Sequence, residues 1–138
     1  MRLENIQIGR DPKKPNQLAF HRSDIESSAL SGTQIIVENE ISSLNFKDKF
    51  VWRGERGFDR GEFLPLGFDG VGKVIWSGPD SKATLGSRVL FFAQDGDLKS
   101  QGGFQRFSIH SAEKTVPLYS LKSKDAITLG VPGFTALA

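Results

Sequence analysis

The chain has 138 residues and no cysteine. Disulfide bonds and metal sites with thiolate ligands are therefore excluded. Its two histidines, His21 and His110, lie too far apart in the sequence to match a metal-ligand spacing. Tyrosine is nearly absent as well, since Tyr119 is the only one. The chain therefore has few of the cysteine, histidine and tyrosine side chains that bind metal ions in proteins.

Long apolar runs and strong charge are also missing. No apolar run approaches the length of a membrane span, and Arg2 and Glu4 interrupt the N-terminus where a signal peptide would need an apolar core. The net charge is only +2, and Lys13-Lys14 is the one adjacent pair of basic residues. A nucleic-acid-binding face would need a basic cluster. We therefore expect a cytoplasmic protein with no membrane or nucleic-acid partner.

The remaining pattern is mainly that of strands. Residues 33–41 alternate apolar and polar side chains, which predicts a half-buried strand. Residues 87–93 contain a continuous apolar run, VLFFA, which predicts a central strand, and Pro117 marks 114–118 as an edge strand. Further strands are predicted at 3–8, 72–78 and 103–110. The fold class predicted is mainly β, a small partly open barrel with short helices.

The C-terminal residues lose the alternation. Ser123 is expected to cap a helix over 124–129, which Gly130 would end. Pro132 would sit in the first turn of a second helix. Because the chain stops at Ala138, we expect this C-terminal helix to be truncated.

The stretch LPLGFDGVGKV (64–74) places Gly67, Gly70 and Gly72 around a carboxylate, Asp69. Glycine in a strand marks either a close approach of backbone and ligand or a bend and packing device. Both explanations stay open, although the packing one is favoured for Gly70 and Gly72. The spacing is not the G-x-G-x-x-G dinucleotide fingerprint, and the chain has no other phosphate-binding loop.

Five segments in order carry a family resemblance: SSLNFKDKFVWRG (42–54), LPLGFDGVGKVIWSG (64–78), GSRVLFF (86–92), GGFQRFSIH (102–110) and DAITLGVPGFTALA (125–138). Together they resemble the N-terminal, GroES-like domain of the medium-chain dehydrogenase/reductase superfamily. Its zinc-free quinone oxidoreductases and acrylyl-CoA reductases are the most similar, and the enoylreductase domains of polyketide synthases come second. Residues 1–29 fit only as a leading strand pair.

The resemblance implies an oxidoreductase. Residues 1–124 would be the GroES-like, substrate-side catalytic domain, and 125–138 would begin the connection to a missing Rossmann domain that binds NADPH. The substrate would be a quinone, an enone or an acyl-CoA-like thioester, and a homo-oligomer is possible. Without the cofactor domain the chain would be inactive. The alternative is a non-catalytic GroES-like binding or assembly module.

The same resemblance argues against zinc. Gly67, Phe68 and Asp69 take the places of the Gly-His-Glu segment of zinc-dependent members, where the histidine binds the metal. Phenylalanine has no donor atom for a metal. The resemblance therefore implies NADPH as the cofactor and no metal.

Asn45, Asp48 and Asp69 are the implied catalytic residues, with Asn45 donating its amide to a developing enolate oxygen. Asn45 and Asp48 could instead cap the short helix that follows them. Asp69 could instead accept backbone N–H groups, which is the more common role of such a residue.

The cofactor side would include Asn45, Phe46 and Thr135. The Thr135 hydroxyl could instead bond back to the preceding helical turn. Some relatives place a proton-donating tyrosine where this chain has Phe58, and phenylalanine cannot donate a proton.

Overall fold

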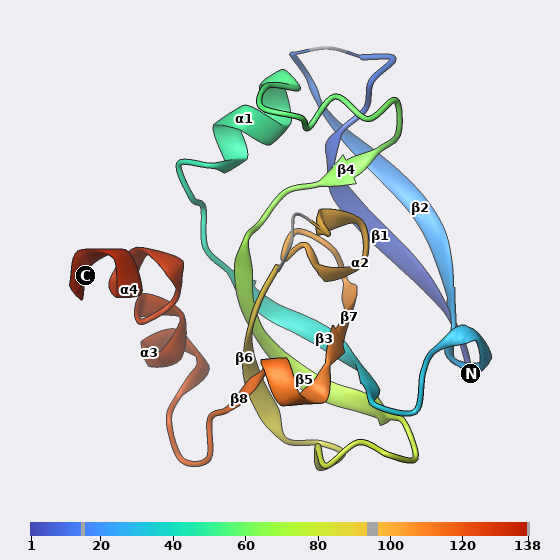
Figure 1. Cartoon of the computed structure of the whole chain (residues 1–138), viewed down its shortest axis with the longest axis vertical. Coiled ribbons are helices and arrows are strands. Elements are labelled where there is room, and N and C mark those ends of the chain that lie inside the picture. Colours follow the sequence, from blue (N-terminus) through green and yellow to red (C-terminus); the bar gives the residue numbers. More distant parts are fainter. Residues whose placement is uncertain (15, 94–96, 138) are drawn as a thin grey trace.

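The computed structural model of the chain describes residues 1–14, 16–93 and 97–137 (Figure 1). Its strands are β1 (Arg2–Arg10), β2 (Leu18–Glu26), β3 (Gln34–Ser42), β4 (Leu64–Pro65), β5 (Asp69–Ser77), β6 (Arg88–Phe92), β7 (Phe107–Ser111) and β8 (Val116–Pro117). Its α-helices are α1 (Asp48–Arg53), α2 (Leu98–Gln101), α3 (Ser123–Thr128) and α4 (Val131–Leu137), and two short 3₁₀ turns cover Ser27–Ala29 and Ala112–Lys114.

The strands form two antiparallel sheets. One has the order β2-β1-β4 and the other the order β7-β3-β5-β6-β8. A single bridge between Gln7 and Gln105 connects β1 to the segment that leads into β7. Figure 1 shows α1, α3 and α4 on one side of the sheets and β2 along the opposite margin. The predicted fold class, mainly β with a partly open barrel and short helices, is confirmed.

Strand β3 is buried on both faces over its first half. The sequence predicted burial of only one face. Ile35 and Val37 pack with the five-stranded sheet, against Val74 and Phe91. Ile36, on the other face, packs against Ile25 of the β1–β2 ribbon. The prediction of a half-buried strand is wrong here because the ribbon covers the second face. The edge position predicted for the strand with Pro117 is confirmed by β8.

The glycines of β5 are explained by packing. A Cβ atom built on Gly70 would lie 2.3 Å from the Phe91 ring. One built on Gly72 would lie 2.3 Å from the backbone oxygen of Glu38, on the neighbouring strand β3. Both approaches are closer than atoms in contact allow, so these positions admit no side chain without movement.

Gly72→Ala is therefore expected to lower the free energy of unfolding by about 1–3 kcal/mol, the usual cost of overpacking a core. The backbone of β3 would have to move, since the obstructing atom belongs to Glu38. Urea denaturation measures the change. Gly32→Ala is the matched control, because its Cβ meets only the side chain of the exposed Asp80, which can turn away. Equal stability of Gly72→Ala and the parent chain would contradict this packing.

The first of the two C-terminal helices differs in its details from the one predicted. Helix α3 begins at Ser123, but the Ser123 hydroxyl donates to Glu40 Oε2 at 3.0 Å and does not cap the helix. Ala126 of α3 is buried against Val71 and Leu90. Helix α4 begins at Val131, so Pro132 lies in its first turn, as predicted. Of the helices that the structure describes, none has the length and apolar character needed to cross a membrane.

His110 is a buried histidine of β7. Its ring lies 4.2 Å from the Phe91 ring, centroid to centroid, and its Nε2 atom is 2.8 Å from the Ser108 hydroxyl. Because the Ser108 hydroxyl donates to Asn39 Oδ1, it is left to accept from Nε2–H. Burial lowers the pKa of His110 from 6.5 to about 3, so the ring is neutral in the folded chain.

The chain is expected to lose stability as the pH falls below 6.5. In that range the unfolded chain binds a proton at His110 and the folded chain does not, down to a pH of about 3. The expected loss is about 1.4 kcal/mol per pH unit, or about 2 kcal/mol between pH 7 and pH 5. Urea denaturation at the two pH values measures it. His110→Phe should remove most of this dependence, whereas replacing the exposed His21 by glutamine should keep it. A dependence unchanged in His110→Phe would contradict the assignment.

Candidate functional site

The turn that leads into α1 is held by two reciprocal side-chain bonds. Asn45 Oδ1 accepts from the Lys47 backbone N–H at 2.9 Å, and Asp48 Oδ2 accepts from the Asn45 backbone N–H at 2.7 Å. Both N–H groups precede the helix, whose N-cap residue is Lys47 and which has no side-chain cap bond. Asn45 and Asp48 therefore brace the turn before α1 and do not cap the helix itself.

Asp48 also ties this turn to the glycine-rich stretch. Its Oδ1 atom accepts from the Gly67 backbone N–H at 2.7 Å. Gly67 has a φ of +92°, a conformation that favours glycine. The Asp48 side chain is buried, and burial raises the pKa of Asp48, with a further rise from the Asp69 carboxylate and an opposing effect of the Gly67 and Asn45 N–H groups. Both carboxylate oxygens therefore have structural partners.

Asp69 connects the same region to α4. It is fully buried, its Oδ1 accepts from the Ser43 hydroxyl, and its Oδ2 accepts from the Val131 backbone N–H at 2.7 Å. Val131 is the first residue of α4, so the carboxylate satisfies a free donor at the helix start, where negative charge is also favoured. Asp69 thus acts as an acceptor of N–H and O–H groups in the folded chain.

The two remaining site residues lie at the surface. Phe46 is 71% exposed and meets the Phe50 ring edge-on at 5.2 Å between centroids. Thr135 is exposed on α4, and its hydroxyl donates to the Val131 carbonyl at 2.8 Å. This is the bond to the preceding turn that the sequence offered as the alternative for Thr135. One lone pair of the hydroxyl remains for another donor.

Hydrogen bonds connect the turn before α1 to Gly67 through Asp48, and the start of β5 to the start of α4 through Asp69, whereas Phe46 and Thr135 have their contacts within their own segments. We call this set the α1 corner: Asn45, Phe46, Asp48, Asp69 and Thr135. Sequence reasoning missed Ser42 and Ser43, whose hydroxyls donate to the backbone and the side chain of Asp69. It also missed Gly103, whose N–H donates to the Gly67 carbonyl. The Ser-Ser and Gly-Gly pairs in the sequence were the available signals.

Phe68 lies under the corner. It is buried, and its ring meets that of Phe58 edge-on at 6.2 Å between centroids. Phe58 therefore packs into the apolar cluster beneath the corner, at the place where the resemblance led us to look for a tyrosine. The Lys47 ammonium lies 5.7 Å from the Phe68 ring centroid. A second ammonium, that of Lys49, lies 5.6 Å from the Phe46 ring centroid, so two cations lie beside aromatic rings in this region.

Asn45 is the corner's available donor. Its Oδ1 atom is used by Lys47, and within the described part of the chain Nδ2 has no hydrogen-bond partner. The side chain is only partly buried. A fixed amide N–H that faces solvent at a rigid turn can stabilise a negative oxygen on a bound molecule.

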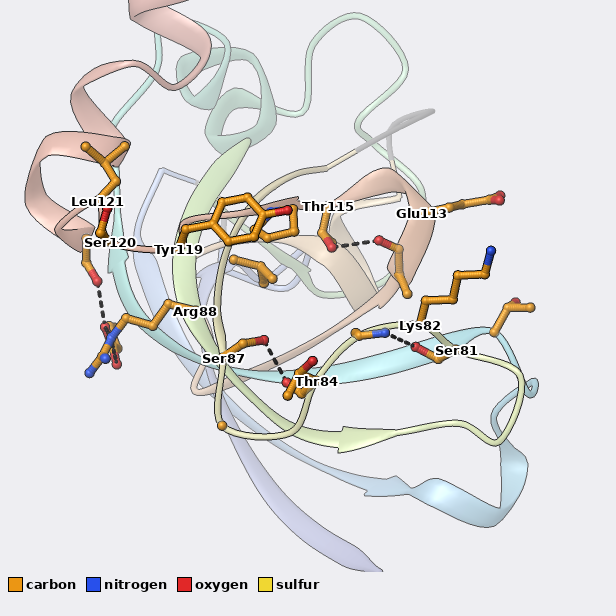
Figure 2. Close-up of a pocket in the computed structure, with 18 of the residues that line it drawn as sticks. Ser81, Lys82, Thr84, Ser87, Arg88, Glu113, Thr115, Tyr119, Ser120 and Leu121 are labelled. Carbon is orange, nitrogen blue, oxygen red and sulfur yellow. Dashed lines mark hydrogen bonds and ion pairs between the residues drawn. The ribbon is translucent and has the colours of Figure 1, made fainter.

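A large groove of about 1010 Å³ lies elsewhere, between residues 80–89 and 112–123 (Figure 2). Figure 2 shows Tyr119 and Lys82 projecting from its walls. Its other charged groups carry both signs, and Arg88 is already paired with Glu40 at 2.9 Å. The groove includes no residue of the α1 corner. A smaller groove of about 340 Å³ between β1 and residues 103–106 includes Ser42 and Gly103, which bond to Asp69 and Gly67, but no residue of the corner itself.

Comparison with protein-family models gave no match, and no curated protein matches the chain either. Solved structures do match. The quinone oxidoreductase from Coxiella burnetii has a TM-score of 0.78 and 22% identity over 98% of this chain. The CurF ER cyclopropanase of the curacin A pathway has a TM-score of 0.76 and 20% identity over 97%. The yhdH oxidoreductase from Salmonella enterica, solved in complex with NADP, has a TM-score of 0.70 and 24% identity over 99%.

These likenesses establish the fold. The resemblance predicted from the sequence is therefore confirmed at the level of the fold. The chain spans only part of each of these structures, 44% of the Coxiella enzyme, 42% of CurF ER and 41% of yhdH.

Proposed function

We propose that the chain is the substrate-side domain of a zinc-independent, NAD(P)H-dependent reductase of quinones or of enones and enoyl thioesters. The observation that carries the proposal is the Asn45 amide, held in the turn before α1 by its bond from the Lys47 N–H, with its own N–H groups free for a ligand oxygen. The fold shared with a quinone oxidoreductase and with CurF ER supports the same assignment.

Each residue of the corner has a role in this proposal. Asn45 donates to the substrate oxygen as negative charge develops there. Asp48 and Asp69 position the turn and α4 through the N–H groups that they accept, and the catalytic role predicted for these two residues remains a prediction. Phe68 places an apolar ring where a zinc-dependent enzyme would need a ligand, which favours chemistry without zinc.

Phe46 and Thr135 would hold the nicotinamide. The Phe46 ring is 71% exposed, with the Lys49 ammonium 5.6 Å from its centroid, and the Thr135 hydroxyl can still accept a hydrogen bond from a carboxamide N–H. NADPH, when bound, would supply the hydride. Its phosphates would need a Rossmann domain, to which residues 125–138 would form the connection, so the chain alone is proposed to be inactive.

Turnover assays test the proposal. The 138-residue chain is mixed with NADPH and either a benzoquinone or an enoyl thioester, and NADPH oxidation is followed. No turnover is expected. The same chain joined after Ala138 to a nicotinamide-binding Rossmann domain is expected to turn over one of the two substrate classes. Saturable turnover by the chain alone, or none by a folded fusion that binds NADPH, would contradict the proposal.

A further inference from the structure

Strand β2 is an unpaired edge of unusual length. All nine residues, Leu18–Glu26, pair with β1 in one uninterrupted register, with no bulge, glycine or proline. The other side of β2 has no strand partner in the described sheets, and Figure 1 shows it along the outer margin of the fold. An exposed edge of this kind presents free N–H and C=O groups to another strand.

The outward-facing side chains of β2 limit what can pair with it. Arg22, Asp24 and Glu26 follow one another on one face, and their side chains are 76%, 46% and 52% exposed. Phe20 precedes them on the same face and is 77% exposed. Across the β1–β2 ladder, Asp24 stands directly opposite Glu4, which is a repulsive pair that only the neighbouring arginines offset.

A second copy of β2 complements this pattern in one antiparallel register. With a two-fold axis at Ser23, Arg22 lies opposite the partner's Asp24, and the symmetric contact repeats the pair. An axis at Arg22 would place two arginines opposite each other, and an axis at Asp24 would place two aspartates there. An axis at His21 would pair no opposite charges. Directly opposed side chains in such a ladder are close enough for ion pairs to stabilise it.

We infer that the chain forms a two-fold symmetric dimer by antiparallel pairing of β2 with β2 of a second copy, centred on Ser23. The pairing joins the two three-stranded sheets into one sheet of six strands. It satisfies the free backbone groups of both edges and brings a positive charge beside each Asp24. Such a contact is self-complementary, as a two-fold interface requires. The inference does not depend on the proposed function.

Sedimentation of charge variants tests the dimer. Arg22→Asp would place two aspartates opposite each other at both symmetric contacts, and it is expected to weaken the dimer by about tenfold or more. The double variant Arg22→Asp with Asp24→Arg exchanges the two charges, so it is expected to restore the dimer. Arg106→Asp is the matched control, since Arg106 also forms an exposed ion pair, with Glu38, but lies away from β2.

A crosslink tests the register. The parent chain has no cysteine, so Ser23→Cys introduces a single thiol. Directly opposed residues have Cα atoms about 4.5–5.5 Å apart, within the range that a disulfide spans. Mild oxidation is expected to give a covalent dimer of Ser23→Cys and not of Ser120→Cys, an exposed position in the turn after β8.

The outcomes are distinct. A dimeric parent chain, a weakened Arg22→Asp variant and a restored double variant support the inference, provided that circular dichroism shows each variant folded. A monomeric parent chain at submillimolar concentration would overturn it. So would a folded Arg22→Asp variant that dimerises as well as the parent, or a Ser23→Cys variant that crosslinks no better than Ser120→Cys.

Discussion

Replacing Asp69 by alanine is expected to lower the free energy of unfolding by about 3–5 kcal/mol. The carboxylate is fully buried and accepts hydrogen bonds from the Ser43 hydroxyl and the Val131 backbone N–H. Its removal leaves both donors without this partner, and hydrogen bonds to a charged group contribute more than neutral ones. Urea denaturation measures the loss, and amide exchange should show Val131 losing protection as α4 separates from β5.

Two further variants test whether the loss of stability comes from these two hydrogen bonds. Asp69→Asn keeps an oxygen acceptor for one of the two donors, so its loss should be intermediate. Asp80→Ala removes a carboxylate that is exposed, and it should change stability by no more than about 0.5 kcal/mol. An Asp69→Ala chain as stable as the parent, with the Val131 amide still protected, would show that the carboxylate does not hold α4 in place.

Replacing Asn45 by alanine should slow the fusion with a cofactor domain about 10²–10³-fold in kcat, with a much smaller change in KM. The reason is that the amide meets the substrate oxygen most strongly when that oxygen carries the charge of the transition state. Steady-state NADPH oxidation with the preferred substrate measures both constants.

The variant Asn45→Asp distinguishes a catalytic role of Asn45 from its structural role in the turn before α1. The aspartate keeps an oxygen for the Lys47 N–H, so the turn and the stability should be retained, whereas alanine loses this hydrogen bond and should cost about 1 kcal/mol of stability. Aspartate has no side-chain N–H to donate, so the Asn45→Asp enzyme should be as slow as the Asn45→Ala enzyme. An Asn45→Asp enzyme with the parent's kcat would show that Asn45 serves only to hold the turn.

The strand content was predictable because the alternation along 33–41 and the apolar run at 87–93 are local signals. The burial of Ile36 was not, since it depends on the β1–β2 ribbon, which packs there from a distant part of the sequence. The side-chain partners at the two C-terminal helix starts were missed for a similar reason. Ser123 bonds to Glu40 on β3, and Asp69 supplies the N-terminal partner of α4 from far along the chain.

The sequence identified the candidate site residues, but most of their contacts became visible only in the structure. The spacing of Asn45 and Asp48 suggested helix caps, but their side chains bond within the turn that precedes α1. The second bond of Asp48, to Gly67, could not be predicted, because it joins two segments that meet only in the fold. Ser43 was overlooked since a serine beside an apolar strand is a common pattern, and only its contact with buried Asp69 sets it apart.

The α1 corner and the large groove offer competing places for a ligand, and one measurement decides between them. A ¹⁵N NMR titration of the 138-residue chain with a benzoquinone, and separately with an enoyl thioester, maps the amides whose shifts change. The account predicts saturable changes at Asn45, Lys47 and Gly67 with at least one of the two ligands, and unchanged shifts at Lys82 and Tyr119. Changes confined to the groove around Lys82 and Tyr119, or no saturable change at the corner with either ligand, would contradict it.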